Sequence, residues 1–368
     1  MKVRGPSMLM LCLLAPATFL TAASTQADET PDSPIEECVG RSELTLPSDA
    51  EAALYSIETV ARLAKPPATL VQARFTDGQV AGYTQWQYRG DLYVTRPVTS
   101  AQVADVLRRF GNLEREDRAY AARKKVDDSG TPLSYEQLSD STRSRASRLG
   151  SSYLATWNLS DIVVHWSSVV GADDTKPNRL AYQTISHSKL RAPFQMPDGP
   201  GVCLPSLFIP DDGKTGRFIA STYRLKQHPD VTVWIQDRDA DGVPPAGKLG
   251  QLEQAAKDGD FFWTQNYQHR KSFRSLWSLP HPIDAPGVVG VASLVELTRD
   301  DDTLDYGYFA SFRGTSDSSL GDTQIKMFVI RDADIALQKG IKPVDKAAFV
   351  ALAESIQRSV RARKATAP

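Results

Sequence analysis

Apolar and polar residues alternate along much of the first half of the chain. Residues 69–75 (TLVQARF), 80–88 (VAGYTQWQY) and 91–98 (DLYVTRPV) alternate and are rich in aromatic and β-branched side chains, which predicts consecutive antiparallel strands. Asp77-Gly78 and Arg89-Gly90 fall between them and predict tight turns. Two later segments, SYLATWN and DIVVHWSSVV, predict further strands.

A helical period interrupts these strands. The segment TSAQVADVLRRFGN predicts a helix capped by Thr99 or Ser100 and ended by Gly111. Its apolar face consists of Val103, Val106, Leu107 and Phe110. The highly charged stretch 113–149 is predicted to be helical and mostly exposed.

The second half is again rich in strands. Residues 191–201 (RAPFQMPDGPG) carry three prolines and two of the chain's glycines, which is typical of a linker. Six strands are predicted after it, namely GVCLPSLFI, GRFIASTYRL, VTVWIQ, GVVGVASLVEL, DYGYFASF and TQIKMFVI. A final helix is predicted after its cap Asp345, with Phe349, Leu352, Ala353, Ile356 and Val360 on its apolar face.

These elements indicate an α+β fold with two domains, each an antiparallel sheet with packed helices. The segments that start at Cys38 (CVGRSELTLP) and Cys203 (CLPSLFIP) are similar, which suggests two related halves. The mature length also exceeds what one core usually serves. We therefore predict domains at 28–192 and 202–368, joined by a linker at 193–201.

The N-terminus has the features of a secretory leader. Lys2 and Arg4 precede an apolar stretch from Met8 to Ala23, and Thr25-Gln26-Ala27 fits a cleavage site. A signal peptide at 1–27 and a periplasmic mature protein are predicted; an N-terminal membrane anchor or a lipoprotein are the alternatives. No other segment is apolar enough to predict a membrane span.

The balance of basic and acidic residues argues against nucleic acid as a partner. Without Lys2 and Arg4, 41 basic residues stand against 44 acidic ones, so the chain lacks the basic field of a nucleic-acid-binding protein.

Two cysteines, Cys38 and Cys203, remain in the mature chain. In an exported protein such a pair favours a disulfide, which would close a loop of about 165 residues. Two buried free thiols or a metal pair are the alternatives, although neither cysteine has the neighbours of a metal site.

Motifs for chemistry are scarce, so no catalytic residue, cofactor or metal is predicted. Asp237, Asp239, Asp241 and Gly242 imitate the start of a calcium loop, but Lys248 occupies the position of its bidentate glutamate, which favours an acidic turn between strands. The chain has no Gly-x-Ser-x-Gly motif and no phosphate loop. Its histidines lack ligand spacing, and His165 is expected in the core of a strand.

Two segments are candidates for partner contacts. The aromatic stretch 261–277 holds Trp263, Tyr267, Arg270 and Trp277, which are residue types that anchor interfaces, although most large aromatic residues belong to cores. The loop TRDDDTLDYG supplies Asp300, Asp301, Asp302, Asp305 and Tyr306, either as a solvated hairpin tip or as an acidic surface that attracts a basic partner.

The segments CVGRSELTLP and GPGVCLPSLFIPDDG, at the starts of the two halves of an exported chain, resemble the two-domain immunity proteins that neutralise type VI secretion phospholipase effectors. The matching positions are Cys38, Gly40, Arg41, Leu44, Leu46 and Pro47 in the first half, and Gly201, Cys203, Phe208 and Ile209 in the second. The strand QHPDVTVWIQ (227–236) is also similar. The resemblance implies a non-catalytic periplasmic protein that binds a cognate lipase or phospholipase with both domains.

We therefore predict an immunity protein in which a Cys38–Cys203 disulfide fixes a two-domain clamp. An exported hydrolase with an unrecognised site, and an envelope scaffold or small-ligand binder, are the alternatives.

Overall fold

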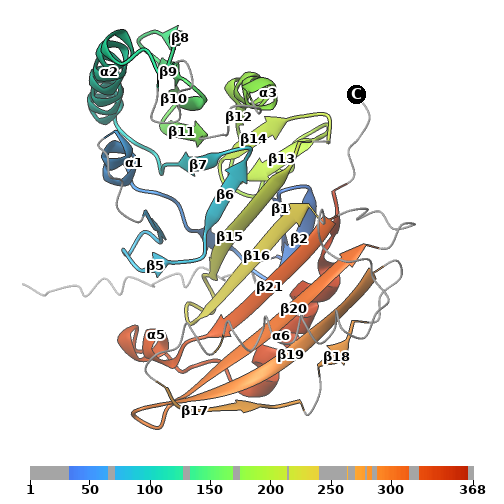
Figure 1. Cartoon of the computed structure of the whole chain (residues 1–368). Coiled ribbons are helices and arrows are strands. Elements are labelled where there is room, and N and C mark those ends of the chain that lie inside the picture. Colours follow the sequence, from blue (N-terminus) through green and yellow to red (C-terminus); the bar gives the residue numbers. More distant parts are fainter. Residues whose placement is uncertain are drawn as a thin grey trace, which may run out of the picture. The chain divides into compact units, whose positions relative to one another are not determined.

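A long antiparallel sheet forms the framework of the computed structural model (Figure 1). The structure describes residues 33–64, 71–126, 133–168, 175–213, 215–239, 263, 270–277, 280–283, 288–314 and 323–363. The side chains of Thr175, Lys176 and Arg270 are not part of that description. The predicted leader at 1–27 lies outside the described residues, as does Tyr267.

The two halves of the sequence contribute separate blocks to the path of this sheet. The block from the second half runs in the order β17 (Arg270–Ser275), β19 (Val288–Arg299), β20 (Leu304–Gly314), β21 (Thr323–Arg331), β16 (Val231–Asp239) and β15 (Arg217–Leu225). The block from the first half continues with β6 (Gln85–Tyr88), β7 (Asp91–Val94), β11 (Ile162–Ser168), β10 (Ser152–Leu159), β9 (Ser144–Leu149) and β8 (Tyr135–Asp140).

The blocks join where β15 pairs with β6, a junction that we call the seam. Arg217 lies opposite Tyr88 there, and Ala220 lies opposite Gln85. Off the path, β3 (Ala50–Ala52) also pairs with β15, and β18 (His281–Pro282) pairs with β19. The sheet therefore continues without a break from one half of the sequence into the other.

Smaller sheets flank this framework. The N-terminal hairpin of β1 (Ile35–Val39) and β2 (Ser42–Leu46) pairs with β22 (Arg361–Ala362), which is close to the C-terminus. A second small sheet contains β12 (Lys189–Leu190), β14 (Leu207–Pro210) and β13 (Gly201–Leu204), and a third contains β4 (Ala73–Arg74) and β5 (Val80–Ala81).

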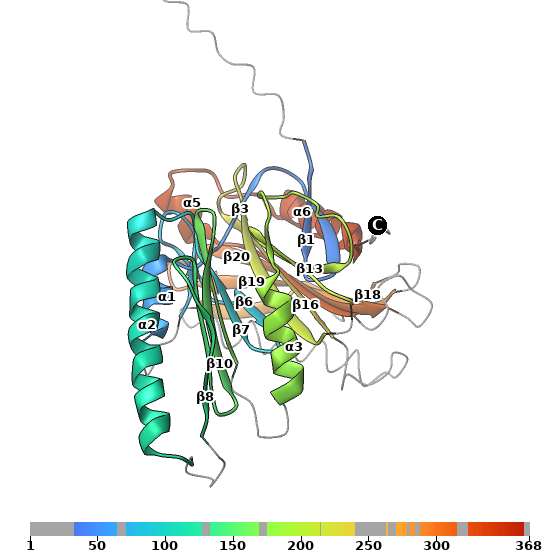
Figure 2. The same cartoon turned by 90° about the horizontal axis from the view of Figure 1, so that it is seen from above.

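The helices cover faces of the main sheet. The described ones are α1 (Ile57–Leu63), α2 (Ser100–Arg123), α3 (Thr175–Ser186), α5 (Ala333–Gln338) and α6 (Lys346–Ser359). Figure 2 shows α2 and α3 on opposite sides of β8 and β10. In the second half, α6 packs against β2, β20 and β21. No described helix is long and apolar enough to cross a membrane.

Alternation along the strands sorts their side chains between two cores. In β16, Val233 and Ile235 belong to the main core, to which α6 contributes Phe349. Trp234 points to the other face and packs in a separate aromatic cluster with Trp263. This is the period of two that the sequence predicted, and the α+β class is confirmed.

The predicted start of α2 is confirmed, but its predicted end is wrong. Thr99 caps the helix in a capping box with Gln102, and the helix then continues past Gly111 to Arg123. Gly111 is buried beside the guanidinium of Arg145 in β9. A glycine inside a helix costs about 1 kcal/mol, and continued packing of α2 against the sheet offsets that cost. The stretch 113–149 is therefore only partly helical, because β8 and β9 follow.

The final helix is confirmed. Asp345 caps α6 by accepting a hydrogen bond from the backbone of Ala348, and the buried side chains of α6 are Phe349, Ala353 and Ile356. Contacts group Ser33–Pro368 into one compact unit. The division into domains at 193–201 stays a prediction.

Candidate functional site

A disulfide joins the N-terminal hairpin to the second half of the chain. Cys38 in β1 and Cys203 in β13 are bonded, their Cα atoms lie 5.7 Å apart, and both side chains are fully buried. Gly40 and Cys203 also exchange two backbone hydrogen bonds of 2.9 and 2.8 Å. The predicted pairing is confirmed, and the bond lies inside the core of the second half, where the hairpin also meets β22.

A buried ion pair lies beside the disulfide. Arg191 donates hydrogen bonds to the carboxylate of Glu37 and, at 2.8 Å, to the Sγ atom of Cys38. Burial raises the pKa of the Glu37 carboxyl, and the charge of Arg191 opposes that shift. The sequence placed Arg191 at the start of an exposed linker, so its burial was missed. Nothing local distinguishes it from a solvated arginine.

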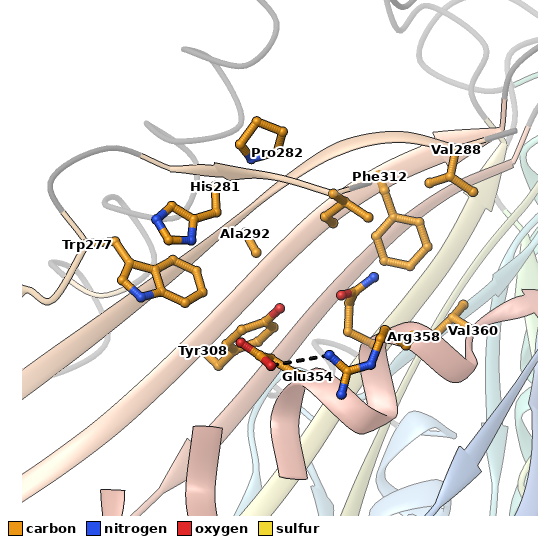
Figure 3. A pocket seen from close by; sticks show the side chains of 12 residues that line it. Trp277, His281, Pro282, Val288, Ala292, Tyr308, Phe312, Glu354, Arg358 and Val360 are labelled. Atoms are coloured by element: carbon orange, nitrogen blue, oxygen red, sulfur yellow. Dashed lines mark hydrogen bonds and ion pairs between the residues drawn. The ribbon is translucent and has the colours of Figure 1, made fainter. Parts of the chain in front are cut away.

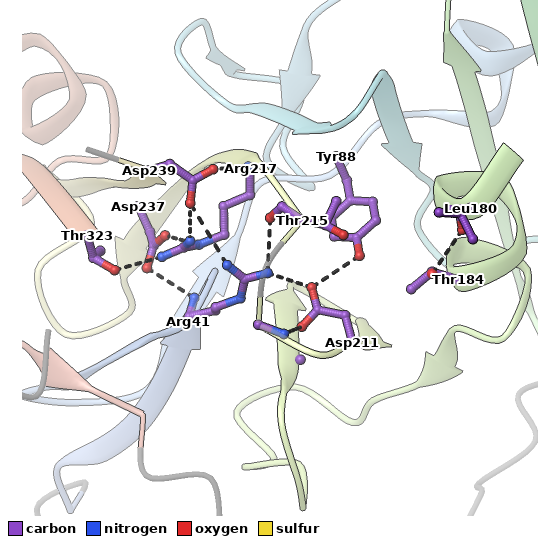
Figure 4. A network of polar contacts seen from close by, with 12 residues as sticks. Arg41, Tyr88, Leu180, Thr184, Asp211, Thr215, Arg217, Asp237, Asp239 and Thr323 are labelled. Atoms are coloured by element: carbon purple, nitrogen blue, oxygen red, sulfur yellow. Dashed lines mark hydrogen bonds and ion pairs between the residues drawn. The ribbon is translucent and has the colours of Figure 1, made fainter. Parts of the chain in front are cut away.

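A network of arginines and aspartates connects the hairpin to the main sheet (Figure 4). Asp237 in β16 is fully buried and accepts hydrogen bonds from Arg217 Nε at 2.5 Å, from Ser42 Oγ at 2.6 Å and from the Arg41 backbone N–H at 3.0 Å. Arg217 also pairs with Asp239. The network therefore ties β2 to β15 and β16.

The same network reaches the first half across the seam. Arg41 Nη2 donates to Asp211 Oδ2 at 2.6 Å, and the hydroxyl of Tyr88 donates to the same oxygen at 3.1 Å. Tyr88 belongs to β6, and the backbone N–H of Arg41 donates to Asp237 of β16. Through Asp211 and Arg41 the network therefore reaches both strand blocks.

The acidic-turn interpretation of the calcium-like motif is wrong for Asp237 and Asp239, because both lie within β16. Asp241 and Lys248 lie outside the described residues. Among the residues that the structure describes, no group of three or more His, Cys, Asp or Glu side chains is placed to hold a metal ion.

A pocket of about 590 Å³ opens at the seam. Its walls come from both halves, and we call it the seam pocket. Aromatic side chains dominate the lining, namely Tyr55, Tyr83, Trp86, Tyr93, Phe218 and Trp234. The backbone oxygen of Tyr83 accepts a hydrogen bond from Trp234 Nε1 at 2.8 Å, which holds one wall.

A buried donor is also part of the seam pocket. Gln236 lines it, is 5% exposed, and its Nε2 atom has no hydrogen-bond partner in the part of the chain that the structure describes. An aromatic, concave surface with a few polar groups is the usual form of a binding site. No local pattern in the sequence indicates this pocket, because its walls combine β6 and β7 with β15 and β16, which are far apart along the chain.

The acidic loop forms the turn between β19 and β20, as the hairpin interpretation predicts. Asp300, Asp301 and Asp302 are exposed, and Asp302 pairs with Lys271 at 2.6 Å. Asp305 is fully buried, pairs with Arg299 and accepts a hydrogen bond from the backbone of Ala333 at the start of α5.

Tyr306, the last residue of this group, is also buried, under the guanidinium of Arg331 and next to Phe349. Both Asp305 and Tyr306 therefore support the fold, and the exposed carboxylates of the turn are Asp300, Asp301 and Asp302.

The predicted aromatic candidates occupy different environments. Trp263 is fully buried in the second aromatic cluster and fills the space over Gly307. Arg270 starts β17. Trp277 is half-buried and stacks on His281 with ring centroids 4.1 Å apart.

Trp277 lines a separate pocket of about 450 Å³ (Figure 3). Tyr308 and Phe312 of β20 contribute to its walls, and Glu354 and Arg358 of α6 lie across from Trp277, paired at 3.2 Å. The structure therefore leaves Trp277, and not Trp263, at a concave surface.

His165 is a core residue, as predicted. Its ring is buried, stacks on Phe110 at 4.7 Å and shares a 2.8 Å hydrogen bond with the hydroxyl of Thr156. Burial lowers its pKa to about 3, so the ring is neutral at physiological pH.

Comparison with known proteins identifies the family to which part of the chain is similar. Residues 195–365 match the family model of the Tle cognate immunity protein 4 C-terminal domain. Residues 195–365 therefore form a domain of the Tle cognate immunity protein 4 family. This agrees with the immunity function that the resemblance of the two cysteine segments implied, and members of such a family are inhibitors without enzymatic activity.

Solved structures of immunity proteins share the fold. The apo structure of the immunity protein TplEi of the type VI secretion system from Pseudomonas aeruginosa is 14% identical, with a TM-score of 0.55, and the match covers 92% of this chain and 99% of that one. A crystal structure of a Tle4–Tli4 complex gives 14% identity, a TM-score of 0.55, and coverages of 91% and 99%. The structure of TplEi complexed with an "L" peptide is 13% identical, with a TM-score of 0.52, and the match covers 91% of this chain and 99% of that one. No curated protein matches the sequence.

Proposed function

We propose that this protein binds and inhibits a cognate lipase or phospholipase effector of a type VI secretion system and so protects the cell that makes it. The match of residues 195–365 to the family model of the Tle cognate immunity protein 4 C-terminal domain carries this proposal. The likeness in fold to a chain of a Tle4–Tli4 complex supports it.

The proposed compartment is the periplasm. The Cys38–Cys203 disulfide supports export, because such bonds persist in oxidising compartments. The predicted leader at 1–27 supplies the route.

We further propose that the two predicted domains, 28–192 and 202–368, hold the effector between them. The path of the main sheet supports this division, since each half contributes its own strand block and, among the described strands of this sheet, the halves pair through β6–β15 and β3–β15. The seam pocket would then receive a projecting segment of the effector. Its aromatic walls suit such an anchor, because Tyr and Trp are enriched in interface hot spots.

The acidic turn and Trp277 are proposed as secondary contacts. Asp300, Asp301 and Asp302 form an exposed acidic surface that would speed association with a basic patch. The inhibitory step would be occlusion of the lipase active site, or a block on the lid movement that gives lipid access to it. Tight inhibition requires a nanomolar complex, which corresponds to about −12 kcal/mol.

The test is co-expression with the lipase encoded beside this protein, directed to the periplasm. The intact chain should restore growth and co-purify with the lipase. Tyr83→Ala should weaken the purified complex about tenfold or more, since it removes an exposed aromatic wall of the seam pocket.

Tyr120→Ala is the matched control. Tyr83 and Tyr120 are both 38% exposed, but Tyr120 lies on α2, away from the seam. Absence of both protection and binding would remove the proposed function. Equal effects of the two variants would remove only the seam pocket as the contact.

A further inference from the structure

A third pocket, of about 420 Å³, lies in the first half of the chain. It is bounded by the ends of the β8–β9 and β10–β11 hairpins, by α3 and by β12, so we call it the hairpin pocket. Its volume is within the range of small-molecule sites. No role in the proposed effector complex requires it.

The charged lining of the hairpin pocket is entirely basic. Arg143 and Arg145 contribute to it, and none of its lining residues is an aspartate or glutamate. Arg145 is already paired with Asp140. The exposed side chain of Arg143 has no ion pair within the described part of the chain. The pocket therefore offers one uncompensated cation.

A buried hydrogen-bond donor lies in the same wall. Trp157 in β10 lines the pocket and is 8% exposed, and its indole Nε1 has no hydrogen-bond partner among the described residues. Buried donors are nearly always paired, and an unpaired one costs about 1–3 kcal/mol. Trp157 lies opposite Ser144, the last pair of the β9–β10 ladder, and Arg143 directly precedes Ser144 in the chain. Both Trp157 and Arg143 therefore line the pocket at the same end of this ladder.

The remaining walls combine polar side chains, mostly serines, with apolar ones. Tyr182 of α3, Leu190 of β12, and Ala155 and Leu159 of β10 line the pocket. Leu190 is 47% exposed, which leaves an apolar rim open to solvent. A group that fits these walls combines an anionic head with an apolar body.

We propose that the hairpin pocket binds an organic carboxylate with an apolar body, such as a short acyl carboxylate. Arg143 holds the carboxylate, since guanidinium groups match its planar geometry. Trp157 Nε1 donates to one of its oxygens, and Tyr182 and Leu190 contact the apolar body. The assignment does not depend on the proposed function, although hydrolysis of an ester by a lipase releases a compound of this class.

Titration with octanoate tests the assignment, with octanol and octylammonium as neutral and cationic probes of the same chain length. The six tryptophans give indole N–H signals in a nitrogen–proton NMR spectrum, and the Trp157 signal is identified by its loss in Trp157→Phe. Octanoate should move that signal downfield and bind at least about tenfold more tightly than either other probe.

Arg143→Gln should weaken octanoate binding about fivefold to tenfold and leave octanol binding unchanged, because it removes only the cation. Arg108→Gln on α2 is the matched control, because that arginine is exposed and remote from the pocket. It should leave octanoate binding unchanged. Equal affinity for octanoate and octanol, a Trp157 signal that does not move, or an unaffected Arg143→Gln variant would each overturn the proposal.

Discussion

Replacing Asp237 by asparagine perturbs the centre of the polar network that ties the N-terminal hairpin to the main sheet. The carboxylate accepts three hydrogen bonds, from Arg217 Nε, Ser42 Oγ and the Arg41 backbone N–H. Asparagine keeps one oxygen for Arg217 but replaces the other by an NH₂ group. The backbone N–H of Arg41 then faces a donor, and the side chain of Arg217, only 3% exposed, loses its fully buried counter-charge.

The expected cost follows from these two losses. An unsatisfied buried backbone N–H costs about 1–3 kcal/mol. Weakening the charged bond to Arg217 adds about 1–2 kcal/mol, because hydrogen bonds to charged groups are worth more than neutral ones. Asp237→Asn should therefore lower the free energy of unfolding by about 2–5 kcal/mol, which overlaps the range for breaking a buried ion pair.

Urea unfolding of the oxidised protein measures this difference. Asp239→Asn is the matched control, since Asp239 also pairs with Arg217 but its side chain is 25% exposed and water can replace it. That variant should lose about 1 kcal/mol. If Asp237→Asn loses no more stability than Asp239→Asn, with unchanged urea dependence, the network does not anchor the hairpin.

Three other stability measurements probe separate parts of the fold. Replacing Cys38 and Cys203 together by alanine should destabilise the protein by up to about 5 kcal/mol, which is the chain-entropy limit for a loop of about 165 residues. If urea unfolding shows a loss below about 1 kcal/mol, the disulfide does not constrain the chain. The pKa of His165 is about 3 in the folded protein and about 6.5 in the unfolded chain. The stability that the neutral, buried ring contributes is therefore fully present above pH 6.5 and is lost as the pH falls toward 3. The free energy of unfolding should therefore fall by about 3 kcal/mol between pH 8 and pH 4.5, and His165→Gln should remove that part of the pH dependence. Gly40→Ala should cost more than 2 kcal/mol, because φ is +60° and the new methyl group would lie 2.5 Å from a buried carboxyl carbon. Gly78→Ala, at φ +89° with open space around it, is the control, and equal melting temperatures for the two variants would refute the steric argument.

Much of the local structure was determined by the sequence alone. The period of two in VTVWIQ and DYGYFASF, the capping residue Thr99 and the capping residue Asp345 each correspond to the observed strands and helices. These signals are local, because backbone geometry and side-chain sorting act over a few residues. The disulfide followed from counting cysteines in an exported chain.

How these strands and helices pack together, and which side chains they bury, was decided by the tertiary structure alone. The start of the first half packs with the C-terminal strand β22, and Arg191, in a predicted linker, is buried against Glu37. Whether an aspartate is a surface contact or an interior partner depends on residues distant in sequence, as the contrast between Asp302 and Asp305 shows. The seam pocket has the same origin, since its walls come together only when β6 pairs with β15. Long-range pairing of this kind leaves no period or spacing in the sequence, so only the folded chain specifies where a partner can bind.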